Sequence, residues 1–286
     1  MADSPSDRGQ KAPTGKAATA GKGLAGATDR MTIIGIGGAL TCVVLSMMLD
    51  GGSPLVLFKP APLVLVWGGT LAASVAGVMR SDVRVVRSVM KQATRSPQRV
   101  PGEDIGRIVG LAEVARREGL LALEKASADV SDPFFKKGIE LTVDGTDPEE
   151  VREVMEGEID ALRERHKAGA KFFTDMGGFS PTLGILGTVI GLVHVLGNLS
   201  TPSALGPAIA SAFTATLWGV LMANLVWLPI ANKLHRASEL EVQNRKLVLD
   251  GILAIQAGSS PRMIEARLLA YLPQSSRESL RKKKAA

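Results

Sequence analysis

The chain has 286 residues, of which 45% are apolar, 4% aromatic and 22% charged, and its formal net charge is +6. Its single cysteine, Cys42, excludes an intramolecular disulfide and a cysteine metal cluster. A pI near 9.5 would suggest a nucleic-acid partner for a soluble protein. Here the basic residues flank long uncharged stretches instead, so we expect a membrane partner and no nucleic acid.

The first 30 residues are rich in Ala, Gly, Lys, Ser and Thr and cannot bury enough apolar surface to fold. We expect a disordered cytoplasmic extension. "GKAATAGKG" has the wrong spacing for a phosphate-binding loop. A cleaved signal peptide over residues 1–49 is an alternative, although "MMLDGGS" is not a small-x-small cleavage site.

Three stretches lack Asp, Glu, Lys and Arg altogether: 31–49, 60–79 and 176–232. Each of the first two has about the length of one membrane crossing, and the third is long enough for two. The turn-forming segment "NLSTPSALGP" divides the third stretch, because a chain can reverse only where its backbone reaches water. The predicted transmembrane helices are 31–49, 60–79, 175–198 and 204–232.

Basic residues mark the cytoplasmic side of these four helices. They precede the first helix, follow the second between Arg80 and Arg99, and follow the fourth from Lys233 to Arg236, whereas the other two connections are almost uncharged. The positive-inside rule then places both termini in the cytoplasm of a multi-pass protein. The predicted organisation is a 1–30 extension, helices 1 and 2 in 31–79, a cytoplasmic helical domain in 80–174, helices 3 and 4 in 175–232, and a cytoplasmic helical segment with a basic tail in 233–286.

The cytoplasmic segments show helical signals and no strand alternation, so we predict an all-α fold. "SDPFF" and "TDPEE" each place Asp before Pro, which is typical of a helix start. Apolar residues then recur at helical spacing at Val151, Met155, Ile159 and Leu162, and nothing stops that helix before the third transmembrane segment. An earlier amphipathic helix has Ile105, Ile108, Ala112 and Ala115 on one side.

Small residues line one side of each of the last two transmembrane helices. These stripes indicate close helix packing in lipid. Thr188 and Thr216 lie at mid-span, where their hydroxyls either face a shared polar path or bond back to their own helices. The stripes are Pro181, Gly184, Thr188, Gly191 and Val195 in the third helix, and Ala208, Ala212, Thr216, Gly219 and Ala223 in the fourth.

No transmembrane segment contains Asp or Glu, the usual carriers of a proton or sodium ion in a membrane. If the chain helps to conduct an ion, a partner must therefore supply the titrating group. His194 lies near the outer end and reads as an interfacial residue. Neither a catalytic set nor a metal-ligand cluster can be assembled, so we expect neither an enzyme nor a cofactor.

Six segments in colinear order resemble the MotA/PomA family of flagellar stator subunits, over roughly residues 30–273. They are "GGALTCVVLSMMLDGG", "LVLVWGGTLAA", "LAEVARREGLLALE", "FFKKGIELTVDG", "GFSPTLGILGTVIGLVHVLGNLSTPSALGPAIASAFTATLWGVLMANLVWLPIANKL" and "LVLDGILAIQAG". The resemblance implies a homopentamer in the bacterial inner membrane around a MotB dimer, whose single span carries the ion-binding aspartate. It also implies that ion flow turns the ring against the rotor protein FliG.

The resemblance assigns roles to particular residues. Pro181 and Pro229 match the family's coupling prolines, and each can kink a helix because it removes a backbone donor. Thr188 and Thr216 match the pore threonines. Sodium-type members carry another threonine where this chain has Ala215, so one oxygen fewer favours protons over sodium.

In the cytoplasm, Arg116, Arg117 and Glu124 match the rotor-contacting charges of the family. Taken alone, these three residues would be a solvated helix face. Two further acidic positions of sodium-type members fall on Lys125 and Ser127, which leaves the charge pattern of the rotor contact open. Two alternatives to a stator are an ExbB- or TolQ-like energy-transducing subunit, which has one span before its large cytoplasmic part, and a helical membrane scaffold that moves no ion.

Overall fold

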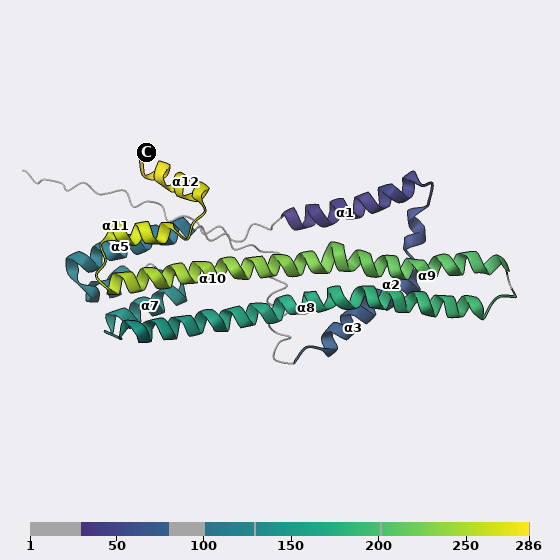
Figure 1. The fold of residues 1–286 in the computed structure, drawn as a ribbon, viewed down its shortest axis with the longest axis horizontal. Helices are drawn as coiled ribbons and strands as arrows, with labels where there is room; N and C mark the ends of the chain where they lie inside the picture. Colours follow the sequence, from purple (N-terminus) through teal and green to yellow (C-terminus); the bar gives the residue numbers. More distant parts are fainter. Residues whose placement is uncertain (1–29, 80–100, 129, 201, 286) are drawn as a thin grey trace, which may run out of the picture.

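The computed structural model describes residues 30–79, 101–128, 130–200 and 202–285, and every regular element in these ranges is helical. The expectations for the N-terminal extension and for the basic segment 80–100 lie outside the described residues. One long helical hairpin forms the frame, with short helices gathered at one of its ends and the N-terminal apolar helices beside the other (Figure 1).

Two antiparallel rods make up this hairpin. The first, α8 (Pro148–Leu196), has 49 residues and is about 74 Å long at 1.5 Å per residue. The second consists of α9 (Pro202–Met222), a π-helical turn (Ala223–Trp227) and α10 (Leu228–Gln256). The chain reverses between them where the sequence predicts it. Both rods continue without a break from the apolar end into the charged end, so the domain boundaries expected at 174 and 232 fall inside continuous helices.

The two Asp-Pro sequences start helices as predicted. At the start of α7 (Pro133–Val143), Asp132 Oδ1 accepts a hydrogen bond from the backbone N–H of Phe134 at 3.0 Å. At the start of α8, Asp147 Oδ1 accepts one from Glu149 N–H at 2.9 Å. Each carboxylate satisfies a backbone donor that has no partner within its helix and lies at the positive end of the helix dipole.

At the charged end of the hairpin, short helices pack around the two rods and enclose an apolar core (Figure 1). The predicted faces are confirmed: Val151, Met155, Ile159 and Leu162 are all buried in α8, and the apolar side of the preceding amphipathic helix is buried except for the partly exposed Ala115. The short helices are α5 (Pro101–Glu118), α6 (Leu123–Ala126), α11 (Pro261–Leu269) and α12 (Gln274–Ala285), together with α7.

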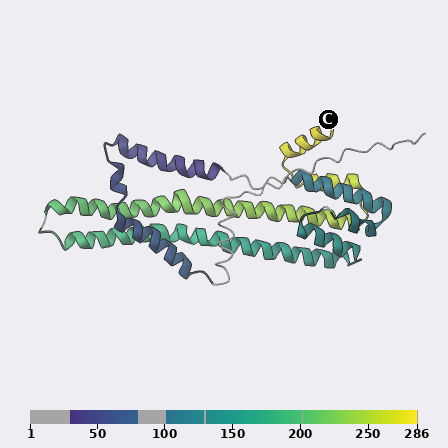
Figure 2. The same cartoon turned by 180° about the vertical axis from the view of Figure 1, so that it is seen from behind.

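The apolar N-terminal helices lie against the other end of the hairpin. Helix α1 lies alongside it, and α3 crosses α8 obliquely (Figure 2). Among the described residues, three helices are long and apolar enough to cross a membrane, with apolar stretches in 31–49, 148–196 and 202–256, and the helix over 60–76 is shorter. The elements are α1 (Arg30–Leu49), a 3₁₀ turn (Pro54–Leu57), α2 (Pro60–Leu63), a π-helical turn (Val64–Gly68) and α3 (Gly69–Ala76).

The second apolar helix ends three residues before the predicted limit at 79. The backbone N–H of Gly77 bonds to Ser74 O, which tightens the last turn and ends the helix. Its 17 residues span about 26 Å, slightly less than a typical hydrocarbon core.

A polar cluster joins the two rods between the apolar core and the membrane part. His166 Nδ1 lies 3.2 Å from Ser238 Oγ, and its Nε2 lies 4.0 Å from a carboxylate oxygen of Glu241. Arg245 pairs with the same carboxylate at 3.4 Å and lies over the ring of Phe134, 4.8 Å from its centroid. Burial lowers the pKa of His166, and the attraction of Glu241 offsets this only in part.

Candidate ion pathway and rotor-contact site

Glycines bring α8 and α9 into backbone contact in the membrane part of the hairpin. A Cβ on Gly219 would lie 2.6 Å from Ser180 O, and one on Gly184 would lie 2.9 Å from Ala215 O. A Cβ on Gly191 would lie 2.6 Å from Ala212 Cβ. Because none of these positions has room for a side chain, the predicted packing role of the small residues is confirmed.

The two predicted pore threonines meet at this seam. Thr188 Oγ1 and Thr216 Oγ1 form a short hydrogen bond, and both side chains are half-buried. The carbonyl of Gly184 lies 3.2 Å from each hydroxyl, and Ala212 O lies 3.2 Å from that of Thr188. Thr188 thus bonds back to its own helix through Gly184 O, whereas Thr216 bonds across to α8. That the two hydroxyls face a shared polar path stays a prediction.

Ala215 occupies a different part of the seam. It is buried against α8, where a Cβ on Gly187 would lie 2.7 Å from Ala215 Cβ. It also lines a cavity whose lining includes neither of the two threonines. The neighbouring hydroxyl of Thr214 donates to Ala210 O in its own helix at 2.8 Å. Neither residue therefore adds an oxygen to the Thr188–Thr216 pair.

The structure places Pro229 beside the turn of α8 that precedes Pro181. Pro181 removes the N–H that would bond to Gly177 O, and Gly177 is packed so closely against Leu228 that a Cβ on it would lie 2.6 Å from Leu228 Cδ2. Leu228 directly precedes Pro229 and bonds back over five residues to Ala223 O, which closes the π-helical turn.

A second π-helical turn, at Val64–Gly68, lies at the same level. Its Trp67 packs edge-on against Trp227 of the first π-helical turn, with ring centroids 6.4 Å apart. Gly69, the residue that follows the turn, packs against Leu183 of α8. Three neighbouring helices thus interrupt their regular hydrogen bonding in one layer. π-Helical turns are rare and often mark functional sites.

The charges matched to the rotor contact lie at the charged end of the hairpin. Arg116 and Arg117 occupy the last turn of α5, where the helix dipole favours cations, and Glu124 lies in α6 after the left-handed Gly119. All three side chains are exposed, as is Lys125, whereas Ser127 is buried and donates to the carbonyl of Glu124 at 3.0 Å.

The structure adds one residue that the sequence analysis does not single out. Leu121 lies between these charges, and 76% of its side chain is exposed, although Leu120 and Leu123 on either side pack into or against the core. The run "GLLALE" is too short for hydrophobic periodicity to predict which of its leucines is exposed to solvent. A single exposed apolar residue is common on protein surfaces, so Leu121 becomes a candidate only through its position among the charges matched to the rotor contact.

Within the described residues, no group of His, Cys, Asp and Glu could hold a metal ion. His194 is exposed at the outer end of α8. The polar atoms of the seam are hydroxyl and carbonyl oxygens. They can bind a cation or form a hydrogen bond to a carboxyl group, but they do not gain or lose a proton near neutral pH.

Comparisons with known proteins agree with this arrangement. A family model described as the MotA/TolQ/ExbB proton channel family matches residues 126–246. The chain is 38% identical over 250 residues to Motility protein A of Bacillus subtilis (strain 168), which covers 87% of this chain and 93% of that protein.

Two solved structures share the fold. A MotAB structure from C. jejuni matches with a TM-score of 0.83 at 30% identity, covering 86% of this chain and 96% of that one. The flagellar MotAB stator complex from Bacillus subtilis matches with a TM-score of 0.81 at 38% identity, covering 87% and 98%. The chain therefore belongs to the MotA family of flagellar motor stator subunits, all-α polytopic membrane proteins within the MotA/TolQ/ExbB proton channel family.

Proposed function

We propose that this stator subunit conducts protons together with a MotB-type partner, whose single span supplies the ion-binding aspartate. The observation that carries the proposal is the half-buried hydroxyl pair of Thr188 and Thr216, in an apolar stretch that contains no Asp or Glu of its own. Two hydroxyls that accept and donate beside a partner carboxyl group can stabilise both of its protonation states. The two solved structures of MotAB complexes support the partner.

The choice of proton over sodium rests on Ala215. The resemblance carries this choice, because a metal cation needs several oxygen ligands and sodium-type members of the family carry a threonine where this chain has Ala215. The buried methyl group lies on the cavity side of the seam and adds no ligand there. Thr214 does not replace it, because its hydroxyl donates within its own helix.

The proposed topology has four transmembrane helices in the bacterial inner membrane and both termini in the cytoplasm. The hairpin supports it, since the turn between α8 and α9 lies at the apolar end and the charged halves of both rods lie together at the other (Figure 1). The shorter helix over 60–76 is the second crossing. The layer of π-helical turns and prolines is then at membrane depth, and we assign Pro181 and Pro229 to a hinge between the ion path and the cytoplasmic half.

For the rotor we assign the contact to the surface formed by Arg116, Arg117, Leu121 and Glu124, with FliG as the partner and a pentameric ring of this chain around the MotB-type dimer. The support is the exposure of these side chains at the end of the hairpin farthest from the transmembrane turn. Reversing Arg116 to Glu should lower swimming speed while leaving membrane insertion intact, and unchanged swimming would count against a docking role for this surface.

The hydroxyl pair is tested with Thr188→Val and Thr216→Val, measured as swimming speed and as proton uptake by vesicles that contain the complex. Both variants should lose most conduction, and the corresponding serine variants should keep it. Thr214→Val is the matched control, because its hydroxyl bonds only within its own helix. Normal conduction in the double valine variant would favour a scaffold that moves no ion.

The ion is tested by replacing sodium in the medium and, separately, by adding a protonophore. Swimming should persist without sodium and stop when the proton gradient collapses. Sodium-dependent swimming would overturn the proton assignment while leaving the stator assignment in place. An ExbB- or TolQ-like role predicts no swimming defect in a deletion strain and a defect in envelope transport instead.

A further inference from the structure

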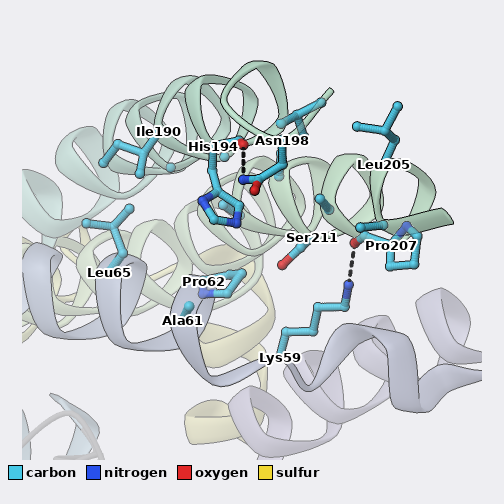
Figure 3. A pocket seen from close by; sticks show the side chains of 17 residues that line it. Lys59, Ala61, Pro62, Leu65, Ile190, His194, Asn198, Leu205, Pro207 and Ser211 are labelled. Carbon is cyan, nitrogen blue, oxygen red and sulfur yellow. Dashed lines mark hydrogen bonds between the residues drawn. The ribbon is translucent and has the colours of Figure 1, made fainter. Parts of the chain in front are cut away.

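A cavity of about 810 Å³ lies at the outer end of the hairpin, between α2 and the facing ends of α8 and α9 (Figure 3). Its size falls in the range of ligand-binding pockets. Neither Thr188 nor Thr216 lines it, so the hydroxyl pair faces elsewhere, while Ala215 forms part of its wall.

The walls change from polar to apolar with depth. Lys59, His194, Asn198 and Ser211 lie near the mouth, where the apolar segments meet their loops, and Figure 3 shows the Ser211 hydroxyl pointing into the space between His194 and Lys59. Deeper in, the lining consists of aliphatic side chains and glycine. Leu65, for example, lies six residues beyond Lys59 along the helix, or about 9 Å further into the membrane.

The mouth carries positive charge. Lys59 donates one hydrogen bond to Pro207 O at 2.9 Å, which fixes its ammonium group over the opening and leaves two further N–H donors on the group. Asn198 holds the neighbouring turn by donating to His194 O at 2.8 Å. None of the described residues that line the cavity is acidic, so the site is suited to an anion at the membrane surface.

The interior is unsuited to water. Water in a cavity needs two to four polar partners, which the deep walls at Leu65, Ile190 and Ala215 do not offer. A void within the hydrocarbon layer is filled instead by the apolar molecules around it. An occupant that fits has an anionic head at interface depth and a flexible apolar tail.

We propose that this cavity binds an anionic phospholipid, with the phosphate against Lys59 and Ser211 and one acyl chain between Leu65, Ile190 and Ala215. The lipid would fill the space between α2 and the glycine-rich α8–α9 seam and so hold the second apolar helix against the hairpin. The proposal requires only that the chain spans the membrane, and it is independent of which ion the complex conducts.

The test uses the stator complex, purified in mild detergent, and native mass spectrometry to count retained phospholipids. The wild-type complex should retain phosphatidylglycerol over phosphatidylcholine by about fivefold, the size of one lysine's attraction to an anionic membrane surface. Inorganic phosphate should not displace the bound lipid, because it lacks the tail. Displacement by inorganic phosphate would overturn the proposal in favour of a simple anion site.

Two variants test separately how the cavity binds the head group and how it binds the acyl chain. Ala61→Phe fills the cavity from an exposed position and should abolish retention, whereas Lys59→Gln should keep a lipid but lose the preference for phosphatidylglycerol. Ala72→Phe, at an exposed position outside the cavity, is the matched control and should behave as wild type. Equal retention in Ala61→Phe and wild type would overturn the proposal.

A second measurement does not depend on how well the variants fold. A phosphatidylglycerol with a photoreactive acyl chain should label the wild-type complex within 59–65, 187–198 or 204–215, the segments that line the cavity. Labelling confined to α1 or α3 would contradict the proposal, because those helices also meet lipid but do not line the cavity.

Discussion

The same two rods are held together in different ways at their two ends. In the charged half, large side chains such as Phe135, Met155 and Ile252 interdigitate in a core that excludes water. In the apolar half, Gly184 and Gly219 bring backbone against backbone. Water drives the first kind of packing through the hydrophobic effect, but lipid tails are as apolar as the side chains, so the second kind depends on close contact and hydrogen bonds.

The difference affects what each half can do. A core of interdigitated side chains resists deformation and gives a rigid base to the charged end of the hairpin, where we propose the rotor contact. The glycine seam of the apolar half lies beside π-helical turns and prolines, so this half has fewer regular hydrogen bonds to break in the layer next to the proposed ion path. The membrane half is therefore the part of the hairpin in which a small movement costs least.

The largest expected effect on stability comes from the charged half. Phe135→Ala removes a side chain that is 1% exposed, and it should lower the free energy of unfolding by about 3–5 kcal/mol. Phe213→Ala, the same change at a 61% exposed position in the membrane half, should cost far less. Thermal unfolding of both variants in detergent, followed by circular dichroism, measures the contrast. Equal losses would mean that the two halves are held by the same force.

A smaller effect is expected at the glycine seam. Gly219→Ala would place a methyl group 2.6 Å from Ser180 O and should destabilise the hairpin by about 1–3 kcal/mol through overpacking. Gly178→Ala makes the same change where no atom lies within 4 Å, and it should be neutral or slightly stabilising. If both variants unfold at the wild-type temperature, backbone contact does not hold the membrane half.

Leu121→Asp should leave stability within about 0.5 kcal/mol of wild type, since the side chain is 76% exposed. It should nonetheless reduce swimming, because it replaces the apolar centre of the proposed rotor surface by a charge. Leu240→Asp, at a 51% exposed position on α10, is the control. Normal swimming in the first variant would remove Leu121 from the rotor contact.

The smallest effect concerns the cluster between the two halves. Because burial lowers the pKa of His166 from its ordinary value of 6.5, the unfolded chain binds the proton more tightly than the folded one. Its contribution to stability is complete above pH 6.5 and declines as the pH falls through that value toward the lowered pKa. Thermal midpoints between about pH 8 and about pH 5 should therefore fall less in His166→Gln than in wild type. If the thermal midpoint depends on pH equally in His166→Gln and in wild type, groups other than His166 control that dependence.

Local signals in the sequence were enough to place most helices. The Asp-Pro caps, the face formed by Val151, Met155 and Ile159, and the reversal between α8 and α9 are all where the pattern predicts them. The end of the second apolar helix at Ala76 is not, because composition says nothing about where a tightened last turn at Gly77 ends it.

The candidate site divides in the same way. The sequence shows which residues are unusual for a membrane: Thr188, Thr216, Pro181 and Pro229 stand out in an apolar run with no carboxylate. It cannot show that the two hydroxyls meet, or that Gly177, one turn before Pro181, packs against Leu228, which precedes Pro229. The residues of each pair lie far apart in the chain and come together only through the register of α8 on α9 and α10.

By itself, then, the sequence determined that the chain is helical, that it is apolar enough to cross a membrane and that its apolar stretches contain no carboxylate, because apolar length, capping residues and absent charges act locally along the chain. Only the tertiary structure decided that Leu121 is exposed, that Ala215 faces a cavity rather than the hydroxyl pair, and that the π-helical turns form one layer. These features depend on which faces of helices far apart in the sequence pack together. Close packing determines those faces through long-range contacts, which a local sequence pattern does not encode.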